Sequence, residues 1–153
     1  MYAILDIEGI QVTQEHICTR KLYILDCCGN DHEEEFVACR DFEQLEEKFK
    51  NAYDHCQRKV HQLPYYPQRL AMPCHSSRSI VRHFVERNVI TVILYKGGTH
   101  EKRLCQDIGV HSYDIGKIVP KVKTHDPREE VNLHMENIVL KHLEEINTIV
   151  NSF

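Results

Sequence analysis

The amino-acid sequence predicts an α/β protein built on a mixed β-sheet, with antiparallel strands first, parallel strands later, and helices flanking the sheet. Two patterns support this fold class. Residues 3–39 contain three apolar segments joined by short polar ones, which is typical of an antiparallel meander. From residue 76 onward, helical and β-branched segments alternate, which indicates crossover connections between parallel strands. The 153 residues fit a single domain, 1–153, large enough to bury a core.

Three strands and a helix are expected in the first half of the chain, and a second helix follows them. The strands cover residues 3–7, 21–28 and 35–39, with a turn at residues 29–31. Asp41 and Gln44 have the spacing of a capping box, and apolar residues then recur at helical spacing as far as residue 60. Ser76 or Ser77 can cap a second helix that ends near Asn88.

Strands and helices alternate in the second half. Residues 89–95 form a continuous β-branched run, typical of a strand buried on both faces. A short helix over residues 101–107 precedes a last strand at 110–115. Asp126 and Pro127 begin a long helix that is expected to reach about Val150. Its expected inward residues are Val131, Met135, Ile138, Val139, Leu143, Ile146 and Val150.

Composition limits the class of protein. Apolar residues make up 42% of the chain and charged residues 27%, as in an ordinary globular protein. No apolar run is long enough to cross a bilayer, and the chain does not open with a basic region followed by an apolar stretch. We therefore expect a cytoplasmic or nuclear protein without a membrane partner. The net charge of −4 argues against nucleic-acid binding through overall charge, but it permits a local basic patch.

Seven cysteines and eleven histidines raise the question of a metal site. The cysteine number is odd and no Cys-x-x-Cys pair occurs, which favours reduced, mostly buried thiols. His55-Cys56, His61 and Cys74-His75 have no spacing typical of a structural zinc site, so scattered surface histidines are the favoured interpretation.

Asp6 and Glu8 follow an apolar run near the start of the chain. Successive side chains of a strand point to opposite faces, so these two carboxylates share one face, roughly 7 Å apart by the strand rise. Unpaired buried carboxylates are costly, and a divalent metal held by oxygen ligands relieves that cost. A strand end where both carboxylates simply reach water is the alternative.

Two further carboxylates lie in segments that can approach the same edge of the sheet. Glu101 follows the expected buried strand, and Glu130 lies in the first turn of the last helix. His125 precedes that helix and is a candidate general base for a metal-bound water. Nucleic-acid hydrolysis by two metal ions requires carboxylates that converge in this way from separate segments.

This combination resembles the DEDDh 3′–5′ exonucleases, which have the ribonuclease H-like fold and use two magnesium or manganese ions. By position, Asp6 and Glu8 match the family's first motif, Glu101 the second, His125 the histidine and Glu130 the last acid. The resemblance covers nearly the whole chain in element order. It implies a domain that removes nucleotides from single-stranded 3′ ends of RNA or DNA, with Asp6, Glu8, Glu101 and Glu130 as metal ligands.

Two positions depart from that family. Glu101 and Glu130 stand where the family has Asp, and the extra methylene displaces a carboxylate that octahedral Mg²⁺ holds at about 2.0–2.1 Å. Glu130 also falls nearly opposite the apolar arc of its expected helix, at about 100° per residue. Asp126, Glu129 and His134 are possible substitutes.

The domain also resembles, more distantly, the nuclease-derived domain of Maelstrom proteins, which carries a Glu-Cys-His-Cys zinc set. Glu8 and His125 match two of those positions, but residues 116–124 contain no cysteine, so zinc bound in that way is not expected.

Basic residues surround the expected site in sequence. Lys96, Lys117, Lys121, Lys123 and Arg128 are candidates for holding a phosphate backbone, although loop lysines are more often simply solvated. The leading hypothesis is a metal-dependent 3′–5′ exonuclease-like domain. The alternatives are a catalytically inactive nuclease-fold module that binds nucleic acid or a protein partner, and a structural domain that assembles through its surface helices.

Overall fold

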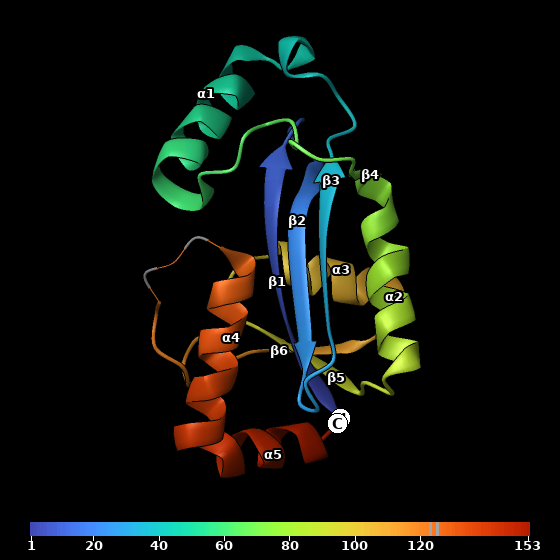
Figure 1. The fold of residues 1–153 in the computed structure, drawn as a ribbon, viewed down its shortest axis with the longest axis vertical. Coiled ribbons are helices and arrows are strands. Elements are labelled where there is room, and N and C mark those ends of the chain that lie inside the picture. Colours follow the sequence, from blue (N-terminus) through green and yellow to red (C-terminus); the bar gives the residue numbers. More distant parts are fainter. Residues whose placement is uncertain (123, 125) are drawn as a thin grey trace.

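The computed structural model describes residues 1–122, 124 and 126–153. Its core element is a mixed sheet of six strands in the order β4-β3-β2-β1-β5-β6 (Figure 1). The strands are β1 (Tyr2–Gln11), β2 (Ile17–Asp26), β3 (Asp31–Val37), β4 (Met72–Pro73), β5 (Val92–Tyr95) and β6 (His111–Asp114). The predicted α/β class with a mixed, helix-flanked sheet is therefore confirmed.

Strand directions follow the predicted division. β1, β2 and β3 are antiparallel neighbours, whereas β5 runs parallel to β1 and β6 runs parallel to β5. The two-residue β4, which the sequence pattern did not predict, adds a parallel partner to β3. β1 thus lies inside the sheet, between an antiparallel and a parallel neighbour.

Helices cover both faces of this sheet. The α-helices are α1 (Glu47–Cys56), α2 (Ser77–Arg87), α3 (His100–Ile108), α4 (Pro127–Asn137) and α5 (Leu143–Asn151), with short helical turns at η1 (Phe42–Gln44), η2 (Gln57–His61), η3 (Cys74–Ser76) and η4 (Ile138–His142). None of the helices in the described part of the chain has the length and apolar character of a membrane span.

Alternation along β1 separates two apolar cores. Leu5 and Ile7 belong to the core formed with α1, α2 and α3, whereas Tyr2 and Ile4 belong to the core formed with α4 and α5. Asp6 and Glu8 continue the row of Tyr2 and Ile4, so they lie on the face covered by α4.

Several predicted boundaries differ from the structure. β3 begins at Asp31 rather than at residue 35, because the turn after β2 is tight enough for pairing to start at once. β5 begins at Val92 rather than at residue 89. Val89 has a positive φ of 54° and lies exposed just after α2, so it belongs to the turn that precedes the strand.

The last helix is not a single rod. After α4, the turn η4 redirects the chain, and α5 runs across the end of the molecule (Figure 1). Val139 and Leu143, predicted to face inward, are 54% and 43% exposed. Val131, Ile138, Ile146 and Val150 are buried as predicted. The prediction was wrong for Val139 and Leu143 because it continued the periodicity of a single α-helix through η4.

Candidate metal centre

Three carboxylates from two elements converge beside the centre of the sheet. Asp6 and Glu8 come from β1, and Glu130 comes from the first turns of α4, which packs across β1 and β2. One oxygen from each lies within 4.8 Å of the others. Oxygens that share an octahedral Mg²⁺ at about 2.1 Å lie about 3–4.2 Å apart, so small side-chain rotations would bring these three around one ion.

Backbone geometry at the end of β1 supports this arrangement. The register between β1 and β2 shifts between Glu8 and Gly9, which marks a β-bulge. A Cβ on Gly9 would lie 2.7 Å from Ile17 Cγ2 and 2.8 Å from His100 Nδ1. Glycine is therefore required here by close packing, directly after the two carboxylates.

Glu101 lies next to this cluster without being part of it. It is only 6% exposed, and its Oε1 accepts a 3.0 Å hydrogen bond from the backbone N–H of Ile7. The negative charge of Glu101 raises the pKa of both Asp6 and Glu8, after larger contributions from burial and from Glu130. Three of the four predicted carboxylates are thus brought together, and the fourth is held beside them by the backbone.

The electrostatics of the cluster favour a bound cation. Burial, followed by repulsion from Glu130, Glu8 and Glu101, raises the pKa of Asp6 to about 9. Burial and the charge of Glu130 raise the pKa of Glu8 to about 7. Asp6 Oδ2 is buried without a hydrogen-bond partner among the described residues. A divalent ion would supply the missing partner and offset the repulsion.

The pKa of Glu101 is raised to about 7, mainly by burial, and hydrogen bonds from backbone N–H groups act in the opposite direction. Glu130 differs from the other three carboxylates. Burial acts to raise its pKa, but the His134 ring, a hydrogen bond with the protonated Asp6 carboxyl and the positive charge of Lys96 together hold it below its ordinary value. Glu130 is consequently the member that stays ionised most readily.

Two basic side chains lie at this edge of the cluster. His134 is 2% exposed, and its Nε2 lies 3.5 Å from Glu130 Oε1, within ion-pair range but without the geometry of a hydrogen bond. Lys96 follows β5, and its buried Nζ has no hydrogen-bond partner among the described residues. Lys96 was predicted only as a residue that holds a phosphate backbone, and its position directly after the buried strand β5 explains why its charge reaches Glu130.

The other acidic candidates are engaged elsewhere. Asp126 caps α4 by accepting from the N–H of Arg128, and it lies 3.4 Å from Lys21 Nζ. Glu129 accepts a 2.7 Å hydrogen bond from the Thr124 hydroxyl. Neither carboxylate belongs to the cluster of Asp6, Glu8 and Glu130.

The predicted basic residues occupy different environments. Lys117 and Lys121 are exposed in the connection from β6 to α4. Arg128 is also exposed, but it lies 5.8 Å over the ring of Tyr23 and 3.7 Å from Glu33. His125, predicted as the general base, and Lys123 lie outside the described residues.

Comparison with known proteins gives no family for the chain. No protein-family model matches it, and no curated protein matches its sequence.

Proposed function

We propose that the chain is a ribonuclease H-like domain of the DEDDh exonuclease type, which hydrolyses phosphodiester bonds at nucleic-acid 3′ ends with magnesium or manganese. The observation that carries this proposal is the convergence of Asp6 and Glu8 of β1 with Glu130 of α4. These are three of the four acids that the resemblance assigns to metal binding. They come from positions far apart in the chain.

The topology supports the same proposal. An antiparallel β1-β2-β3 unit is followed by crossovers to β5 and β6, with the acidic pair on the internal strand β1. This arrangement agrees with the ribonuclease H-like plan, in which the first strand carries the first metal ligands.

Each acid has a distinct role in the proposed site. Asp6, Glu8 and Glu130 would hold Mg²⁺ or Mn²⁺, and Glu101 would contribute its second oxygen while Oε1 stays bonded to Ile7. The bound ions would stabilise negative charge on the scissile phosphate and make water a stronger acid. His125 is proposed as the base that removes the proton from the attacking water.

Basic residues beside the acidic cluster form the surface on which the substrate is proposed to bind. A Cβ on Gly116 would lie 3.8 Å from Lys96 Cγ, so the connection that carries the exposed Lys117 and Lys121 begins beside Lys96. In the proposed site these exposed lysines hold the phosphate backbone of a single strand that enters the acidic cluster. Arg128 lies on the same face, over Tyr23, the β2 residue paired with Asp6.

Digestion of 5′-labelled RNA and DNA single strands in Mn²⁺ tests the proposal. For the wild type we expect a ladder of products shortened from the 3′ end. Digestion by Asp6→Asn should be at least about 100-fold slower, because a metal ligand loses its charge. Glu129→Gln, next to Glu130 but outside the cluster, is the matched control and should retain activity. A ladder that survives Asp6→Asn would come from a contaminating nuclease.

A non-catalytic nucleic-acid-binding module is the second candidate. It is favoured by the position of Glu101, which stands outside the three-carboxylate cluster and uses one oxygen to bind the backbone of Ile7. Binding of labelled single strands that persists without any digestion, in either metal, would support this candidate over the enzyme.

A further inference from the structure

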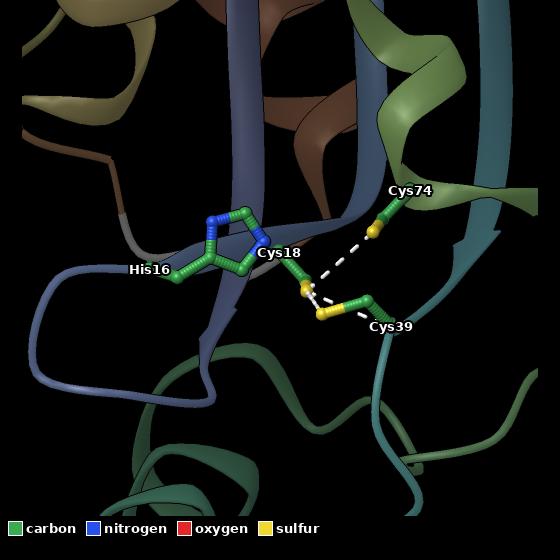
Figure 2. Close-up of side chains that lie close together, drawn as sticks. All are labelled: His16, Cys18, Cys39 and Cys74. Atoms are coloured by element: carbon green, nitrogen blue, oxygen red, sulfur yellow. Dashed lines mark hydrogen bonds between the residues drawn. The ribbon is translucent and has the colours of Figure 1, made fainter.

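Three thiols and an imidazole gather at the end of β2 that lies away from its hairpin with β3 (Figure 2). Cys18 is near the start of β2, and His16 lies in the turn that precedes this strand. Cys39 lies just after β3, and Cys74 begins η3 directly after β4. The cluster shares no residue with the acidic one.

The distances within the cluster are close to those of a metal site. Cys18 Sγ lies 3.2 Å from Cys39 Sγ and 3.5 Å from Cys74 Sγ, and one ligand atom from each of the four residues lies within 4.8 Å of the others. Tetrahedral zinc with Zn–S bonds of about 2.3 Å holds its sulfurs about 3.8 Å apart. A disulfide requires about 2.05 Å, and throughout the described residues the cysteines are free.

We propose that His16, Cys18, Cys39 and Cys74 form a structural zinc site. Three soft thiolates and one imidazole match the donor set of closed Cys₃His sites, in which zinc has no position left for a substrate. Zinc was not expected from the sequence, where Glu8, His125 and the adjacent His-Cys pairs were the residues considered for it. Of the four residues proposed here, only Cys74 belongs to those pairs.

Backbone hydrogen bonds fix the segments that carry His16, Cys18 and Cys39. The carbonyl of His16 accepts hydrogen bonds from the N–H groups of Val12 at 3.0 Å and Thr13 at 3.3 Å, which holds the turn between β1 and β2 closed. The N–H of Cys39 donates to Cys18 Sγ at 3.4 Å. Such N–H···S contacts stabilise a thiolate that is bound to a metal.

The site would connect segments that are far apart in the sequence. Cys18 is 21 positions from Cys39 and 56 from Cys74, and the chain between the latter two contains α1. A zinc ion would hold both ends of the segment from Cys39 to Cys74 against Cys18 of β2. Because the unfolded chain lacks the preformed site, the free energy of zinc binding would add to the stability of the fold.

Elemental analysis of the full chain, purified in reducing buffer without added metal, tests the proposal. We expect about one zinc ion per chain in the wild type and its loss in Cys39→Ser, because three ligands bind zinc far more weakly than four. Cys39 is exposed, so serine should not disturb packing. His16→Gln should also lose zinc, whereas the matched control His75→Gln, next to Cys74 but outside the cluster, should retain it.

Cobalt substitution supplies an independent readout. The wild type loaded with Co²⁺ should show the visible and charge-transfer bands of a tetrahedral thiolate site, and Cys39→Ser should lose them. Asp6→Asn should leave zinc content and cobalt spectrum unchanged, which separates this site from the acidic cluster.

Three outcomes would overturn the proposal. The first is a metal-free chain whose cysteines all react as free thiols. The second is a mass loss of two hydrogens that maps to a disulfide between Cys18 and Cys39. The third is zinc that remains in both Cys39→Ser and Cys74→Ser, or a different metal in its place.

Discussion

The backbone N–H of Ile7 donates a 3.0 Å hydrogen bond to Glu101 Oε1, which fixes the start of α3 to β1 between the two carboxylates Asp6 and Glu8. β5 pairs with β1 only at Tyr2–Ile4, so the neighbouring strand ends before it reaches Ile7. The Glu101 side chain thus replaces a strand partner and, at the same time, places a charge beside the acidic cluster.

Replacement of Glu101 should separate these two roles. Glu101→Ala leaves the buried N–H of Ile7 without an acceptor, and we expect it to lower the free energy of unfolding by about 1–3 kcal/mol. Glu101→Gln keeps an oxygen acceptor and should cost less. Urea unfolding of both variants measures the difference; equal losses of stability would show that the hydrogen bond does not stabilise the fold.

The stability of the metal-free protein should depend on pH. The folded pKa of Asp6 is raised to about 9, and those of Glu8 and Glu101 to about 7, all above the unfolded values. The folded state therefore favours the protonated carboxyls. Their contribution to stability is fully present below the unfolded pKa values, and it is lost as the pH rises through the folded ones.

In chelator, the melting temperature should therefore fall between pH 5 and pH 9 by more in the wild type than in Asp6→Asn, whose amide does not ionise. Mn²⁺ should restore the wild type at pH 8, because binding offsets the repulsion. Parallel pH profiles for the two proteins in chelator would show that ionisation of Asp6 does not destabilise the fold.

A side chain at position 9 should destabilise the fold. A Cβ would lie 2.7 Å from Ile17 Cγ2 and 2.8 Å from the His100 ring, neither of which is the end of a flexible chain. We expect Gly9→Ala to destabilise the fold by about 1–3 kcal/mol, as overpacking does. Gly116→Ala, whose Cβ would meet the Asp114 carboxylate at 3.0 Å, is the milder comparison. Similar melting temperatures for both would contradict the packing argument.

The exposed lysines after β6 should control nucleic-acid affinity rather than folding. Lys117→Ala combined with Lys121→Ala should weaken binding of a labelled single strand. The slope of log K against log salt should decrease by about 0.7 for each phosphate that a lysine no longer neutralises. Lys141→Ala, also exposed but located in η4, is the control. An unchanged salt slope would place the binding surface elsewhere.

Local patterns were sufficient to predict the main parts of the fold and one side of the acidic cluster. Alternation along a strand correctly placed Asp6 and Glu8 on the face opposite Leu5 and Ile7, because this property depends on backbone geometry alone. Capping residues likewise predicted the start of α4 at Pro127.

Long-range packing determined what the patterns missed. The helical wheel placed Glu130 away from the core because it assumed one straight helix to Val150. The turn η4 interrupts that helix, so the inward face of α4 differs from the face that the whole segment predicts. The thiol cluster depends on the register of β2 and β3 and on where β4 returns to the sheet, so the spacing of its cysteines gives no local signal.

Mn²⁺ binding followed by electron paramagnetic resonance at pH 8 tests the central claim most directly, since free and bound Mn²⁺ give different spectra. We predict saturable binding by the wild type and at least about 10-fold weaker binding by Asp6→Asn and by Glu130→Gln, because each removes one charged oxygen ligand. Glu129→Gln should bind like the wild type. Equal Mn²⁺ affinity in all four proteins would contradict a metal centre formed by Asp6, Glu8 and Glu130.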